Sequence, residues 1–98
     1  MTRDNLTPIQ SALATLLAGH DKPESVLRER LAAAGWSTEA IDEAIVWGRS
    51  RKWIDDHRVA DQLVRRRLDR RPPASRAMLH LELTEKGIAE EIIQRVLD

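Results

Sequence analysis

Residues 52–60 read Lys-Trp-Ile-Asp-Asp-His-Arg-Val-Ala, and this stretch divides the chain into two halves. Asp55 and Asp56 carry short side-chain acceptors, which suit the free amide groups at the start of a helix. Trp53 and Ile54 come just before them, where an apolar residue packs against the first turns of the following helix. The stretch therefore predicts a junction between two units, residues 1–54 and residues 55–98.

Residues that start or end helices recur on both sides of this junction. They predict helices over about 8–18, 24–34 and 38–52 in the first half, and over about 55–71, 74–86 and 89–98 in the second. The inner stripes are predicted to include Leu68 in the fourth helix and Met78 in the fifth. Gly48 lies inside the third helix, where glycine costs about 1 kcal/mol relative to alanine. We interpret it as a position where another helix packs closely.

The two halves correspond when the chain is shifted by 52 residues. Two leucines and a glycine recur at the same spacing: Leu27, Leu31 and Gly35 in the first half, Leu79, Leu83 and Gly87 in the second. Repeats of this size are typical of stacked units that share a continuous core. The repeat predicts an all-α fold of two tandem three-helix repeats, forming an elongated helical stack of right-handed type.

The composition excludes several classes of protein. With 16 basic and 16 acidic residues the formal net charge is zero, which argues against coating nucleic acid by bulk charge but allows a local basic patch. The absence of cysteine removes disulfides, thiolate catalysis and thiolate metal sites. No apolar run reaches the ~20 residues that span a bilayer, and no apolar signal segment follows residues 1–5. We expect no membrane association and a cytoplasmic protein.

Nine basic side chains are candidates for contact with a partner, because guanidinium and ammonium groups bind phosphate and carboxylate. They are Arg65, Arg66, Arg67, Arg70 and Arg71 on the fourth helix, Arg76 after the prolines, and Arg49, Arg51 and Lys52 at the end of the third helix. The alternative interpretation is a solvated helix face, partly neutralised by Asp61 and Asp69. If the helices stack as the repeat suggests, the nine residues line one surface.

Catalytic and metal-binding patterns are missing from the sequence. His20, His57 and His80 are scattered, without a second ligand at metal spacing, and no glycine-rich phosphate loop or nucleophile context occurs. We therefore expect neither an enzyme nor a metal or other cofactor. Trp47 lies off the inner stripe, and two interpretations are open. It is an exposed anchor for a partner, or it packs against the other repeat, which is the interpretation that we favour.

The order of these motifs resembles the RecX family, bacterial regulators of the RecA recombinase. The resemblance runs from about Gln10 to Asp98, and its most specific parts are Trp53-Ile54-Asp55-Asp56 and Glu85-Lys86-Gly87-Ile88. It implies tandem three-helix repeats, no catalysis, and roles in homologous recombination, DNA repair and the SOS response. It also implies binding in the groove of the RecA filament on DNA, in most cases with inhibition.

The sequence also departs from the family pattern, and alternatives stay open. Family members usually carry three repeats, whereas this chain ends after the second, and Lys52, Val59 and Gly48 replace a common glycine, phenylalanine and leucine. One alternative is a small three-helix module that binds single- or double-stranded DNA, although base-reading Asn and Gln residues are dispersed. Another is a helical adaptor. An apolar end face near Leu97 would favour a homodimer.

Overall fold

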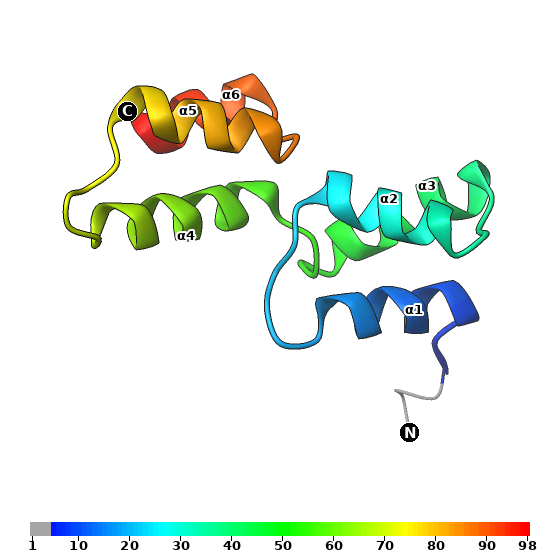
Figure 1. Ribbon diagram of the computed structural model, residues 1–98. Helices are drawn as coiled ribbons and strands as arrows, with labels where there is room; N and C mark the ends of the chain where they lie inside the picture. Colours follow the sequence, from blue (N-terminus) through cyan, green and yellow to red (C-terminus); the bar gives the residue numbers. More distant parts are fainter. Residues whose placement is uncertain (1–4) are drawn as a thin grey trace.

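A computed structural model describes residues 5–98, and these fold into six α-helices without a strand (Figure 1). The helices are α1 (Pro8–Leu17), α2 (Glu24–Ala33), α3 (Thr38–Ser50), α4 (Asp56–Leu68), α5 (Arg76–Glu85) and α6 (Glu90–Leu97). The predicted all-α class is confirmed. The sequence predicts that no apolar signal segment follows residues 1–5. Residues 1–4 lie outside the described residues.

Local side-chain chemistry explains most of the helix starts. Thr7 and Gln10 form a reciprocal capping box at α1, in which each side chain accepts a hydrogen bond from the other's backbone amide. Ser37, Asp55 and Ser75 cap α3, α4 and α5 in the simpler way. The starts of α2 and α6 follow Pro23 and Ala89, which supply no side-chain cap. Helix α2 therefore needs a partner from elsewhere.

Buried apolar residues form two separate clusters, one for each group of three helices. The first contains Leu13, Leu27, Leu31, Ile41, Ile45 and Ile54, and the second contains Ala60, Leu63, Val64, Leu79, Leu83, Ile88 and Ile93. Helices α1, α2 and α3 contact one another, and α4, α5 and α6 make the same three pairings. The expectation of one continuous core is therefore wrong. The residues between the clusters are largely charged, and charged groups interrupt an apolar core.

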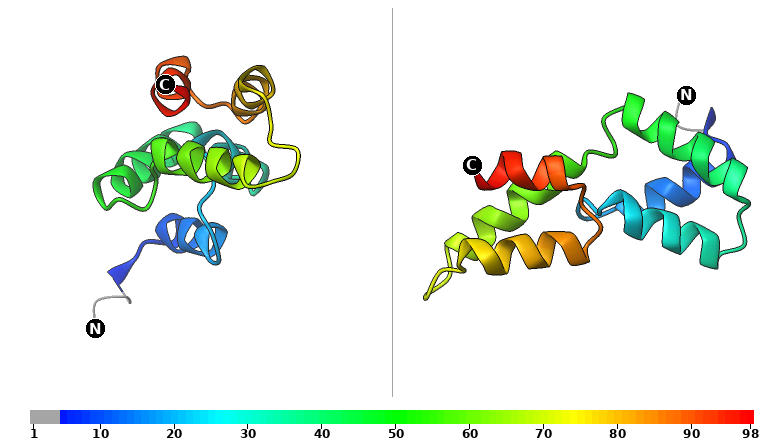
Figure 2. Two further views of the ribbon diagram at one scale, coloured as in Figure 1. Left: turned by 90° about the vertical axis from the view of Figure 1, so that its left-hand side faces the viewer. Right: turned by 90° about the horizontal axis from the view of Figure 1, so that it is seen from above.

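The two groups of helices lie end to end, with α4 leading from the first into the second (Figure 2). The chain measures 45 × 28 × 20 Å and has a radius of gyration of 15.1 Å. A compact chain of this length has a radius of about 13 Å, so the predicted elongated shape is confirmed. The boundary between residues 54 and 55 and the right-handed sense of the stack stay predictions. In support of that boundary, Ile54 packs in the first cluster and the second begins at Ala60.

Helix α4 is shorter than predicted. It ends at Leu68, and Arg70 and Arg71 lie in the connection to α5. The Arg67 carbonyl accepts hydrogen bonds from the amides of Arg70 and Ala74, which turns the chain before the prolines. The predicted inward position of Leu68 is also wrong, because this side chain is 51% exposed.

The fifth helix buries a narrower stripe than predicted. Leu79 and Leu83 are buried, but Met78 is 63% exposed. Helix α5 packs mainly against α4 and α6. Met78 lies about 100° around the helix from Leu79 and lines an open groove beside the connection between α4 and α5, where it stays accessible.

Gly48 and Trp47 show how tightly the first group packs. A Cβ atom on Gly48 would lie 2.7 Å from Ile54 Cδ1 and 3.2 Å from Leu13 Cδ2, which confirms that this glycine permits close packing. Trp47 meets Trp53 edge to face at 4.8 Å and packs against the first cluster. The prediction that Trp47 packs was right, but its contact is within its own half and not with the other repeat.

Two corresponding glycines allow a matched test of contact between the halves. Gly35 and Gly87 both adopt positive φ, 99° and 80°, where an L-residue costs about 1–2 kcal/mol. An added Cβ meets nothing at Gly35, but at Gly87 it lies 2.7 Å from Ser25 Cβ. We expect Gly87→Ala to lower the free energy of unfolding by about 1 kcal/mol more than Gly35→Ala. If urea unfolding gave the same loss of free energy of unfolding for both variants, the Ser25 contact would contribute nothing to stability.

Candidate partner-binding surface

The nine predicted basic residues do not behave alike. Arg67 donates two hydrogen bonds to Glu82, at 2.9 and 2.5 Å, and ties α4 to α5. Its guanidinium lowers the pKa of the Glu82 carboxyl. Arg49 is bound to Glu24, and Arg76 to the carbonyl of Leu97. These three arginines are engaged by other residues of the fold, and their role in partner contact stays a prediction.

Two further arginines have local partners but stay accessible. Arg65 pairs with Asp61 one turn earlier at 3.0 Å, and its side chain is 78% exposed. Arg51 lies 5.2 Å from the centre of the Trp47 ring, a cation–π contact. Exposed contacts of these kinds contribute about 1 kcal/mol or less. A partner of stronger charge could therefore displace them.

Four of the nine form neither an ion pair nor a cation–π contact within residues 5–98. They are Lys52, Arg66, Arg70 and Arg71, and all four are exposed. Arg70 borders a groove of about 510 Å³ in which Met78 and Leu81 are exposed. Lys52 adopts a φ of 65°, which explains why glycine suits this position in the pattern of the family. Helix α4 separates Lys52 from Arg66, Arg70 and Arg71, since residues 56–65 alone rise about 14 Å. The expectation of one surface for all nine residues stays a prediction.

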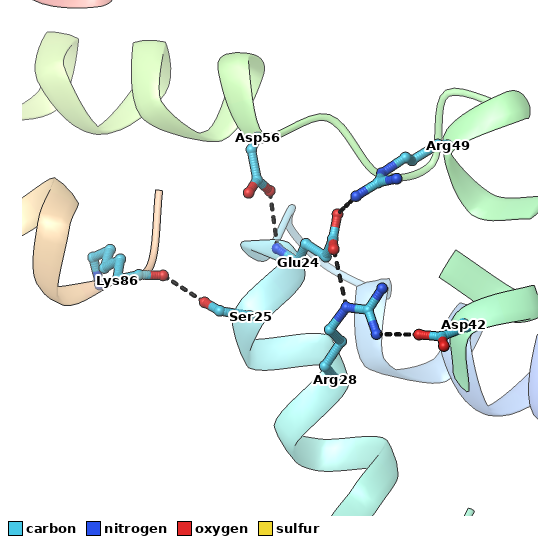
Figure 3. Close-up of polar contacts among 7 residues, drawn as sticks. All are labelled: Glu24, Ser25, Arg28, Asp42, Arg49, Asp56 and Lys86. Carbon is cyan, nitrogen blue, oxygen red and sulfur yellow. Dashed lines mark hydrogen bonds and ion pairs between the residues drawn. The ribbon is translucent and has the colours of Figure 1, made fainter. Parts of the chain in front are cut away.

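The contact between the halves depends on a polar network that sequence reasoning found only in part. The Glu24 amide, the first of α2, donates a hydrogen bond of 2.9 Å to Asp56 Oδ1 (Figure 3). Asp55 accepts from the Arg58 amide at 3.0 Å and caps its own helix, α4. The two adjacent carboxylates therefore cap two different helices. The capping role was predicted, but not that Asp56 caps α2.

Glu24 is also the centre of a set of ion pairs. Its carboxylate binds Arg28 at 3.0 Å and Arg49, and Arg28 in turn binds Asp42 at 2.6 Å (Figure 3). Arg28 and Asp42 lie on α2 and α3, so this set fixes the first group of helices. Since the amide of Glu24 is bound by Asp56, the same residue links that group to α4.

Two further contacts join the halves. Arg58 binds Asp21 through two hydrogen bonds of 2.7 and 3.1 Å, and it also donates to the carbonyl of Lys52 at 3.3 Å. The Ser25 hydroxyl donates to the Lys86 carbonyl at 2.5 Å (Figure 3). We call the set Asp21, Glu24, Ser25, Asp56, Arg58 and Lys86 the junction network. No spacing in the sequence pairs Asp21 with Arg58, because nothing local marks a contact over 37 residues.

The carboxylates of the junction network differ in their proton affinity. The hydrogen bonds from Arg58 lower the pKa of Asp21. Burial by itself raises the pKa of Glu24, but hydrogen bonds from Arg28 and Arg49 bring it below the usual value. Burial raises the pKa of Asp56, and the Glu24 amide offsets only part of this effect.

The part of the chain that the structure describes contains neither a candidate metal site nor a candidate membrane-spanning helix. Residues 5–98 contain no group of three or more His, Asp or Glu residues placed to hold a metal ion. None of the six described helices combines the length and the apolar character that crossing a bilayer requires.

The fold and the site define a protein of tandem helical units that carries a charged surface and a polar junction. No protein-family model matches the chain. This chain is 35% identical over 97 residues to the regulatory protein RecX of Pelodictyon phaeoclathratiforme. It is 31% identical over 75 residues to the regulatory protein RecX of Caldanaerobacter subterraneus. These alignments cover 96% and 76% of this chain. The chain belongs to the RecX family, as the sequence predicts.

The structural comparison agrees with this assignment. A crystal structure of regulatory protein RecX matches 91% of this chain with a TM-score of 0.83 and 23% identity, which shows a common fold. The chain spans 59% and 37% of the two curated relatives and 43% of the solved chain. It therefore corresponds to only part of the length of each protein.

Removal of the Asp56 carboxylate tests the cap between the halves. We expect Asp56→Ala to cost about 1 kcal/mol of stability and to expose the Glu24 amide to solvent exchange. The control Asp55→Ala should cost a similar amount but expose the Arg58 amide at the start of α4. Residue-resolved hydrogen exchange shows which amide, Glu24 or Arg58, loses protection in each variant. Unchanged protection of Glu24 in Asp56→Ala would contradict the cap.

Acid should weaken the junction network. Asp21 and Glu24 have lowered folded pKa values, so their stabilisation is complete above the unfolded value of about 4 and is lost as the pH falls through the folded value. The raised pKa of Asp56 acts in the opposite direction and offsets part of the loss.

We expect the free energy of unfolding to fall between about pH 5 and pH 2, and less steeply in Asp21→Asn. Urea unfolding at a series of pH values measures this slope. The control is Glu29→Gln, which alters an exposed glutamate of α2 without an ion pair in the described residues. If Asp21→Asn and Glu29→Gln changed the slope equally, the pair of Asp21 with Arg58 would not be its source.

Proposed function

We propose that this chain regulates a RecA-type recombinase by binding to its filament on DNA, and that the regulation is inhibitory. The observation that carries the proposal is the 35% identity to a regulatory protein RecX over 96% of the chain. The action we propose is binding without catalysis, in the cytoplasm, where the filament forms. A homodimer stays a separate prediction.

The charges of the second half support a binding role. Arg66, Arg70 and Arg71 are exposed and have no ion-pair partner among residues 5–98, so their guanidinium groups are available. Guanidinium forks bind phosphate and carboxylate through paired hydrogen bonds. We propose that these three arginines make the main contact with the filament or its DNA, with Arg65, Arg51 and Lys52 in supporting positions.

The shape of the chain suits such a contact. Its length of 45 Å exceeds its other dimensions, and the chain is narrow, at 20 Å, in its thinnest direction. A narrow rod of helices can lie along a groove and keep its basic side chains in contact over several turns of helix. Inhibition would then arise because the occupied groove is closed to a second DNA strand or because neighbouring protomers are displaced.

A recombinase ATPase assay on single-stranded DNA tests the proposal. We expect turnover to fall as this protein is titrated in, and the double variant Arg66→Ala/Arg70→Ala to need about tenfold more protein for the same effect. The double variant should also reduce the salt dependence of binding, by about two in the slope of log K against log salt if both contacts are to phosphate.

The control removes two positive charges from other helices. Arg30 and Arg95 are exposed on α2 and α6 and form no ion pair within the described residues, so Arg30→Ala/Arg95→Ala matches the change in net charge. Unchanged ATP turnover with the unaltered protein, folded by circular dichroism, would contradict recombinase regulation. Base-specific binding to duplex DNA alone would instead favour the DNA-binding module.

A further inference from the structure

A small cavity lies between the two halves, next to the junction network. Its volume is about 230 Å³, and both halves contribute to its wall. The charged and polar lining residues are His20, Asp21 and Lys22 from the first half and Arg66 and Lys86 from the second. Since a water molecule occupies about 30 Å³ in the liquid, an anion of the size of phosphate fits.

The cavity carries an excess of positive charge. Lys22, Arg66 and Lys86 are the cations of its lining, and Asp21 is its carboxylate. Arg58 already binds that carboxylate through two hydrogen bonds, so Asp21 neutralises little of the remaining charge. Arg66 and Lys86 form no ion pair with any residue from 5 to 98.

One of the cations is held in place by the fold. The Lys22 ammonium donates a hydrogen bond of 2.6 Å to the carbonyl of Leu16, at the end of α1. An ammonium group has three donors, so two remain for a ligand. Lys22 belongs to the first half, whereas Arg66 and Lys86 belong to the second, so basic residues of both halves line one cavity. A cavity lined mainly by one sign of charge attracts an ion of the opposite sign.

The rest of the wall is apolar and strengthens the field. Val59 and Leu63 are 8% and 1% exposed, and Pro23 is buried as well. Charges beside an apolar wall interact more strongly than charges surrounded by water, because the local dielectric constant is lower. An anion in this cavity is therefore attracted more strongly than one at an exposed arginine.

We propose that this cavity binds a phosphate group, with Lys22, Arg66 and Lys86 as donors. A phosphate group presents several acceptor oxygens in a tetrahedral arrangement and can accept from cations on different sides. A carboxylate is planar and has only two acceptor oxygens, so it presents fewer acceptors to cations on different sides. Since three basic residues from both halves line the cavity, phosphate suits it better than a carboxylate does.

Because its donors come from both halves, the bound phosphate also joins them. Binding ties Lys22 of the first half to Arg66 and Lys86 of the second. The ligand therefore stabilises the folded arrangement of the junction. This inference rests on the charge and shape of the cavity and does not require a recombinase as partner.

Titration with inorganic phosphate tests the site, with chloride at equal ionic strength as the reference. We expect amide NMR shifts around Pro23 and Gly87 and a higher melting temperature. We expect Arg66→Gln and Lys86→Gln each to weaken phosphate binding about tenfold. The control is Arg95→Gln, which removes the same charge from an exposed arginine of α6 that does not line the cavity. It should bind phosphate as the unaltered chain does.

A second titration with a short oligothymidylate identifies the source of the phosphate. Binding of both ligands that depends on Arg66 and Lys86 supports a general phosphate site. Binding of the oligonucleotide alone, with the same dependence, supports a site for the phosphodiester backbone, and binding of inorganic phosphate alone supports a site for free phosphate. The proposal is overturned if neither ligand binds, or if Arg95→Gln weakens binding as much as Arg66→Gln and Lys86→Gln.

Discussion

The hydrogen bond from the Glu24 amide to the Asp56 carboxylate is the contact on which the arrangement of this chain depends. Pro23 supplies no side-chain cap, so the first amide of α2 needs an acceptor from another element. Asp56 provides it from the first turn of α4, and this places the starts of two helices from different halves side by side. The ion pair of Arg58 with Asp21 and the hydrogen bond from Ser25 to Lys86 then lie within reach.

A polar junction has different consequences from an apolar one. Each group of three helices closes its own core, so neither needs the other to bury its leucines and isoleucines. The junction network fixes the relative orientation of the two halves and buries little apolar surface. It does so because hydrogen bonds and bidentate ion pairs form in only a narrow range of geometries. The same network responds to pH and salt, to which an apolar core is far less sensitive. The relative orientation of the halves is therefore the part of this fold most open to control by a ligand.

The arginines illustrate how one residue type serves two purposes. Arg66 and Arg67 are neighbours on α4, yet Arg67 is held by Glu82 of α5, whereas Arg66 is exposed beside the junction. A rotation of about 100° along the helix separates the two roles. This distinction decides which charges are available to a partner of the chain. The three exposed arginines Arg66, Arg70 and Arg71 lie on the second half, and the junction cavity lies at its border, so the orientation of the halves sets the shape of this basic surface.

The sequence by itself determined the elements: six helices, most of their caps, the glycine turns at Gly35 and Gly87, and the residues that fill the two cores. These features depend on spacing and capping within a few residues, which a sequence displays directly. Tertiary structure decided which arginines are engaged, why Met78 and Leu68 are exposed, and that Asp56 caps α2 and not its own helix. These outcomes depend on which helices become neighbours. Asp56 and Glu24 are 32 residues apart, and no local sequence pattern predicts a contact over that separation.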